Sequence, residues 1–148
     1  MKKLWMIAVV ACATLLVGCA SLESKAKSFA EDLFEAALAN DETAYDKVNS
    51  EIEEYFNTLP NKAEQDKFEE AVENHLEALR QAHFAEIEKD ADKYAKDYIK
   101  ALNDGDEEKA EKVLEEAEKH CLKLQDAEVA HFNKAFSNKA YSLIWGTE

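Results

Sequence analysis

The feature that most constrains this chain is the spacing of its apolar residues, which recur every three or four positions along stretches almost free of glycine and proline. Such spacing places apolar side chains on one face of an α-helix. Only three of the 148 residues are glycine and one is proline, too few for the many turns of a β-sandwich or barrel. The sequence therefore predicts an all-α fold, a helical bundle of about five to six helices.

Turn-forming residues divide the pattern into five amphipathic segments, at residues 22–36, 44–59, 61–102, 110–124 and 129–143. The sharpest breaks are at Pro60, which cannot continue a helix, and at Gly105, which suits a left-handed C-terminal cap. The third segment has neither glycine nor proline. We expect either one long central helix of roughly 60 Å, at about 1.5 Å per residue, or two helices that break in the polar stretch 88–93.

The segments also repeat within the chain. Alignment of the stretch from Phe29 with the stretch from Tyr94 gives 16 identities over 50 positions, after a one-residue deletion at the Pro60 turn. Some identities arise by chance in a chain this rich in alanine, glutamate and lysine, but the apolar positions and the turns fall in register. The pattern predicts an internal repeat, about residues 29–79 and 94–143, and thus two tandem three-helix units.

The amino terminus has the layout of a secretory signal, with Lys2 and Lys3 before an apolar run at residues 4–17. At fourteen residues the run is shorter than the ~20 that a membrane-spanning helix requires. The run ends in Leu16-Val17-Gly18-Cys19. An alternative is ordinary secretion, with cleavage at Ala11-Cys12-Ala13 and release of a soluble protein.

The motif Leu16-Val17-Gly18-Cys19 resembles the lipobox of bacterial lipoproteins at every position. The resemblance implies that residues 1–18 are a signal peptide recognised by signal peptidase II, and that Cys19 carries a diacylglycerol and an added acyl chain such as palmitate. Two or three chains anchor a protein stably, since each buried methylene adds about 0.8 kcal/mol. The expected location is the cell envelope, and the outer membrane where the cell has two, because Ala20 rather than aspartate follows Cys19.

The mature chain, residues 19–148, is expected to be a single acidic helical domain. It carries 16 basic and 32 acidic residues, a net charge of −16. Such a field repels nucleic-acid phosphates and anionic lipid head groups, and favours basic proteins or divalent cations as partners. The alternative interpretation of this charge is a solvated helix surface without a specific partner.

Groups that could hold a metal are sparse. Glu128-x-x-His131 matches half of the signature of helical di-iron proteins, which need a second such pair and two further glutamates. His75 and His83 lie eight residues apart on one predicted helix, where His83 falls on the apolar stripe. We therefore predict no metal and no cofactor; a metal-dependent enzyme that uses these histidines ranks last among the alternatives.

The mature chain also lacks an obvious nucleophile. Cys121 is its one remaining thiol if Cys19 is lipidated, so no internal disulfide can form. Cys121 falls on an apolar stripe, which predicts a buried and inert thiol, and a reactive one is the alternative. Its neighbour His120 points about 100° away on a helix. Trp145 is expected to plug the end of the bundle.

These observations predict a non-enzymatic, lipid-anchored envelope protein, a helical binding or scaffold module with a protein partner of unknown identity. One alternative is an inhibitor or immunity lipoprotein, whose acidic face neutralises a basic toxin or hydrolase. Another is a carrier that holds a small ligand between its helices. Tyrosines on the helical stripes could line such a cavity or form the edge of the core: Tyr45, Tyr55, Tyr94, Tyr98 and Tyr141.

Overall fold

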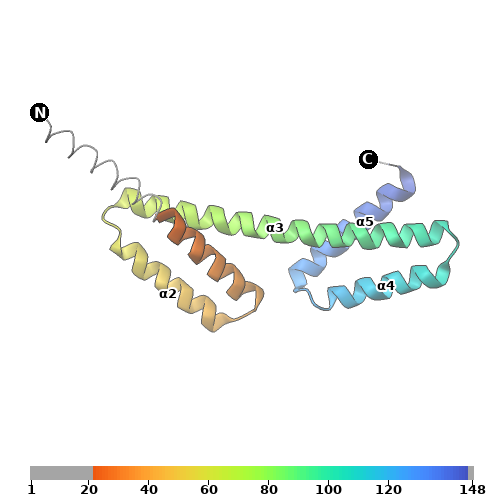
Figure 1. The fold of residues 1–148 in the computed structure, drawn as a ribbon, viewed down its shortest axis with the longest axis horizontal. Helices are drawn as coiled ribbons and strands as arrows, with labels where there is room; N and C mark the ends of the chain where they lie inside the picture. Colours follow the sequence, from red (N-terminus) through yellow and green to blue (C-terminus); the bar gives the residue numbers. More distant parts are fainter. Residues whose placement is uncertain (1–21, 147–148) are drawn as a thin grey trace, which may run out of the picture. The chain divides into compact units, whose positions relative to one another are not determined.

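The computed structural model describes residues 22–146, and this part of the chain folds into α-helices without any strand (Figure 1). The prediction of an all-α fold is confirmed. The first described helix spans residues 22–38, and the others are α2 (Glu42–Thr58), α3 (Lys62–Asn103), α4 (Glu107–Cys121) and α5 (Asp126–Trp145).

α3 is one continuous helix of 42 residues, so the first of the two expectations for the central segment is confirmed. It continues through the polar stretch 88–93, where Lys89 forms an ion pair with Glu86 one turn earlier. Ala91 and Ala95 are fully buried on its inner face. Packing on both sides of the polar stretch, together with the absence of a helix-breaking residue, keeps the helix unbroken.

Two connections between helices have the same backbone construction. Asn40 and Gly105 each follow a helix and adopt the left-handed conformation, with φ of +52° and +73°. In both turns the next residue donates its backbone N–H to the carbonyl five residues earlier, at 3.0 and 2.9 Å. This hydrogen bond satisfies a carbonyl that the end of the helix would otherwise leave unpaired.

The helices that follow these turns are also capped alike. The Asp41 carboxylate accepts a hydrogen bond from the backbone N–H of Ala44 at 2.9 Å. The Asp106 carboxylate accepts one from the N–H of Lys109 at 3.0 Å. Aspartate at the N-cap satisfies a free backbone donor and favours the positive end of the helix dipole, which explains why α2 and α4 begin where they do.

The chain divides into two compact units at Arg80–Gln81, within α3. Unit 1, as described at residues 22–80, contains the first described helix, α2 and the first part of α3. Unit 2, as described at residues 81–146, contains the remainder of α3, α4 and α5.

The core of unit 1 centres on Phe68, whose side chain is 1% exposed. The rings of Phe29 and Tyr55 lie 6.0 and 4.9 Å from it, measured between ring centroids. Ala26 on the first described helix is fully buried beside this group and lets the helices approach closely. Further apolar residues complete the cluster: Leu22, Ile52, Phe56, Leu59, Ala71, Val72 and Leu76.

The core of unit 2 centres on Phe132, which is 2% exposed. The rings of Tyr94 and His120 lie 6.0 and 5.4 Å from it. Fully buried Ala91 on α3 lies in the same cluster. The other members are Phe84, Ile87, Ala117, Cys121, Leu124, Ala135 and Phe136.

One expectation about the carboxyl terminus is wrong. Trp145 does not plug a bundle, because its side chain is 67% exposed. The residues of α5 that pack into the core of unit 2 end at Phe136. Beyond them the helix presents Tyr141 and Ile144 at 60% and 57% exposure, and Trp145 has Tyr141 as a ring neighbour at 6.2 Å.

Candidate functional site

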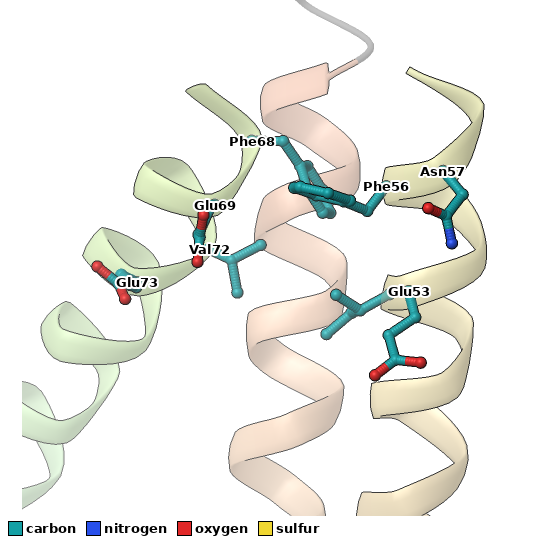
Figure 2. Close-up of a pocket in the computed structure, with 8 residues that line it drawn as sticks. Glu53, Phe56, Asn57, Phe68, Glu69, Val72 and Glu73 are labelled. Carbon is teal, nitrogen blue, oxygen red and sulfur yellow. The ribbon is translucent and has the colours of Figure 1, made fainter. Parts of the chain in front are cut away.

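The candidate site of unit 1 is a groove of about 390 Å³ between α2 and α3. Each of the two helices contributes two apolar side chains to the lining of the groove: Ile52 and Phe56 on α2, and Phe68 and Val72 on α3. In Figure 2, Phe56 and Phe68 point into the space between the two helices. The turn at Pro60 brings the two helices together and so forms the groove.

The rim of this groove is acidic. Glu53 and Asn57 lie on the α2 side, and Glu69 and Glu73 lie on the α3 side (Figure 2). No lysine, arginine or histidine is among the eight residues that line the groove. Residues 22–80 as a whole contain six basic and sixteen acidic residues. An apolar floor beneath three carboxylates is complementary to a ligand that combines an apolar face with positive charge.

All four histidines pair with carboxylates, and each pair lies within one unit. The nitrogen-to-oxygen distances are 2.7, 2.5, 3.6 and 3.0 Å for His75–Glu23, His83–Glu128, His120–Asp90 and His131–Glu88. In unit 2 two of these pairs join α3 to α5. His83 on α3 pairs with Glu128 on α5, and His131 on α5 pairs with Glu88 on α3, so each helix contributes one histidine and one glutamate.

Glu128 is buried at 8% exposure, which is unusual for a carboxylate. Burial raises the pKa of Glu128, but the backbone N–H of Gln125, which donates to it at 2.7 Å, and His83 at 2.5 Å together outweigh burial and hold the pKa below its ordinary value. Glu128 therefore stays ionised and links the start of α5 to α3. Sequence reasoning missed this pair, although Glu128 lies four residues before Phe132, on the buried face.

The two side chains of the Glu128-x-x-His131 motif both form pairs between helices. Both of its side chains are directed to α3, Glu128 to His83 and His131 to Glu88. Within residues 22–146 no three His, Cys, Asp or Glu side chains are grouped so that they could hold a metal ion.

Cys121 ends α4 and is half-buried. Burial, and then the negative charge of Glu118, raise the pKa of its thiol. Both effects disfavour the thiolate, which is the form that reacts with electrophiles or binds metals. The expectation of a buried and inert thiol is thus met only in part, because Cys121 is half-buried rather than buried.

The five tyrosines do not meet in one cavity. Tyr55 and Tyr94 pack in the cores of different units, and Tyr98 lies 6.1 Å from Phe136 between ring centroids. Tyr45 and Tyr141 are 41% and 60% exposed. None of them lines the groove of unit 1.

The predicted lipidation residue Cys19 and the recognition residues Leu16, Val17 and Gly18 lie outside the described part of the chain. Of the helices in residues 22–146, none is long and apolar enough to cross a bilayer. Comparison of this chain with protein-family profiles, with characterised proteins and with solved structures finds no match.

Proposed function

We propose that this protein is a lipid-anchored, non-enzymatic binding module of the bacterial cell envelope, and that the groove of unit 1 binds a basic amphipathic segment of a partner protein. The observation that carries the proposal is the groove itself, in which an apolar floor lies under a rim of three glutamates. Each apolar side chain buried in such a groove contributes about 1.5–3 kcal/mol. The carboxylates add selectivity for cationic partners.

The anchor in this proposal is Cys19, on the strength of the lipobox that Leu16, Val17 and Gly18 form with it. The net charge of the mature chain is strongly negative, so the field of the domain repels anionic head groups. Acyl chains on Cys19 would therefore supply the membrane affinity.

The proposal includes an internal duplication, in which two three-helix units derive from one ancestor. The repeat predicted from sequence is supported by matched local structure in the two units. The turns at Asn40 and Gly105, and the N-caps Asp41 and Asp106, lie 65 residues apart and use the same hydrogen bonds. The three rings of each core also have similar spacings: 6.0, 4.9 and 6.0 Å in unit 1, and 6.0, 5.4 and 5.8 Å in unit 2.

A second candidate is an inhibitor or immunity lipoprotein that neutralises a basic toxin or hydrolase. The acidic rim favours it, because a basic enzyme surface is one form that a cationic partner can take. Deletion of the gene would then sensitise cells to that enzyme, and a protein that serves only as an adaptor would give no such phenotype.

The anchor is tested in cells by metabolic labelling with a fatty acid. The wild-type protein should incorporate label and sediment with membranes, while Cys19→Ala should remain unlabelled and unprocessed. Equal labelling of both proteins would refute lipidation at Cys19.

The groove is tested with the mature chain and a designed helical peptide that has a leucine face flanked by lysines. Glu69→Gln with Glu73→Gln should weaken binding by about twofold to thirtyfold, since two exposed ion pairs are lost and each is worth about 0.2–1 kcal/mol. The control is Asp66→Asn with Glu70→Gln, which makes the same change of charge on exposed positions of α3 that do not line the groove. Equal effects of the two pairs would mean that net charge alone attracts the peptide.

A further inference from the structure

Unit 2 contains a second groove, of about 580 Å³, between α4 and α5. Its apolar surface is formed by six residues: Leu114, Ala117, Cys121, Leu122, Phe132 and Phe136. The polar residues that line it are Glu118 and Asn133. Nothing in the proposed function uses this groove.

The two grooves occupy equivalent positions of the internal repeat. All four residues from α2 that line the groove of unit 1, shifted by 65, fall on residues that line the groove of unit 2. Three of the four residues from α3, shifted by 64, do the same. Only Glu73 lacks a counterpart in the lining. A coincidence of seven positions out of eight is the result expected if the groove was duplicated together with the unit.

Five of these seven positions differ in residue between the grooves. Ala117 in place of Ile52 and Phe136 in place of Val72 change the size of an apolar side chain, and the other three replacements change the chemistry of the side chain. Glu69 is replaced by Asn133, Phe56 by Cys121 and Asn57 by Leu122. The groove of unit 1 therefore has three carboxylates, whereas that of unit 2 has Glu118 alone. The replacement of a polar residue by leucine adds apolar surface at the mouth.

The apolar character of unit 2 extends to its surface. Among the described residues, seven of the nine large hydrophobic side chains that are exposed belong to unit 2, and two of them, Leu114 and Leu122, line its groove. Leu122 is 86% exposed. An exposed leucine at the edge of an apolar groove gains free energy when a ligand covers it.

From this juxtaposition we infer that the groove of unit 2 is a second, diverged binding site, which takes the apolar face of an uncharged polypeptide segment. The inference rests on the proposed function in one respect, that the ancestral groove bound polypeptide. The single carboxylate of unit 2 gives little preference for a basic ligand. The larger volume of its groove, about 580 against 390 Å³, and the exposed Leu122 at its edge let a ligand bury more apolar area there. The protein thus has two related sites with different charge preferences.

Cys121 provides a native reporter for this site, because its half-buried thiol lines the groove. In the mature chain with Cys19→Ala, Cys121 is the one thiol present. Alkylation by N-ethylmaleimide, followed by mass spectrometry, then measures how often the groove is open. A ligand in the groove covers the thiol and slows the reaction.

The probe is a designed helical peptide with a leucine face flanked by glutamines, compared with the lysine-flanked peptide used for unit 1. At about four times its Kd, the neutral peptide leaves about a fifth of the sites free and should slow alkylation of Cys121 about fivefold. Unchanged alkylation at concentrations where the peptide binds would overturn the inference. Protection that depends on protein concentration without peptide would also overturn it, since a second copy of the chain would then be the occupant.

Exchange of equivalent residues between the grooves sharpens the test. Leu122→Asn introduces the residue of unit 1 at a highly exposed position, so the fold is retained and the protection by the neutral peptide should be lost. Asn133→Glu with Ser137→Glu should shift the preference of unit 2 toward the lysine-flanked peptide. Protection that survives Leu122→Asn would place the peptide elsewhere.

The two proposals can fail independently. If the lysine-flanked peptide ignores Glu69→Gln with Glu73→Gln while the neutral peptide still protects Cys121, the proposed function of unit 1 is wrong and the site in unit 2 stands. If the reverse holds, unit 2 has no site and the binding module has a single groove.

Discussion

Replacement of Phe68 by alanine should destabilise the protein more than almost any other single change, because this ring is the centre of the core of unit 1. The side chain is 1% exposed and has aromatic neighbours at 6.0 and 4.9 Å. Loss of its burial removes about 1.5–3 kcal/mol, and the cavity that remains raises the total to about 3–5 kcal/mol.

The assay is urea unfolding followed by circular dichroism at the helical band. With a slope of about 2 kcal/mol per molar urea, a loss of about 4 kcal/mol lowers the midpoint of the affected transition by about 2 M. The control Phe68→Leu keeps most of the apolar volume and loses the two ring contacts, so it should cost about 1–3 kcal/mol. Phe132→Ala should match Phe68→Ala, because Phe132 is 2% exposed with rings at 6.0 and 5.4 Å.

The reasoning would be refuted if Phe68→Ala shifted the midpoint by less than about 0.5 M at an unchanged slope, since a core ring cannot be removed at so small a cost. A severe effect of Phe68→Ala beside a harmless Phe132→Ala would instead refute the equivalence of the two cores.

Three further predictions concern local features. Because the pKa of Glu128 is depressed in the folded state, the stability that its carboxylate contributes is fully present above the ordinary glutamate pKa and is lost as the pH falls through the folded value. The midpoint of urea unfolding should therefore fall as the solution is acidified, and in Glu128→Gln the midpoint should depend less on pH. Asn40→Gly should raise the melting temperature by relieving a left-handed residue, and Gly105→Ala should cost about 1–2 kcal/mol, although a Cβ there meets no atom within 4 Å. N-ethylmaleimide should alkylate Cys121 more slowly than free cysteine, and Glu118→Gln should accelerate the reaction by removing a negative neighbour. Equal alkylation rates for Cys121 and free cysteine would contradict the raised pKa of this thiol.

Local signals in the sequence predicted most of the helices. The spacing of the apolar residues, Pro60 and Gly105 are signals that depend only on residues close together in the sequence. The structure has helix ends next to Pro60 and Gly105. The absence of glycine and proline between 62 and 103 allowed one long α3, but it left a break in the polar stretch 88–93 equally open, and the structure decides for the continuous helix.

Contacts between residues far apart in the sequence could not be predicted from such local signals. The pair His83–Glu128 joins residues 45 positions apart, and each partner alone is an ordinary helix residue. Trp145 continues an apolar pattern beyond the point where α5 has a packing partner in unit 2, so the pattern predicts burial that the fold does not provide. The grooves depend on which faces of α2 and α4 stay uncovered, which only the packed structure reveals.

The border between the two units has a practical consequence for any attempt to divide the protein. It lies at Arg80–Gln81, in the middle of α3, where neither a loop nor a linker exists for a protease to cut. A gene truncated there would leave four backbone carbonyls on one half and four N–H groups on the other without their helical partners. Expression of either half alone therefore requires extra turns of α3. If the two units arose by duplication, a third unit joined in the same way would have to share a continuous helix with its neighbour, as units 1 and 2 share α3, with no linker between them.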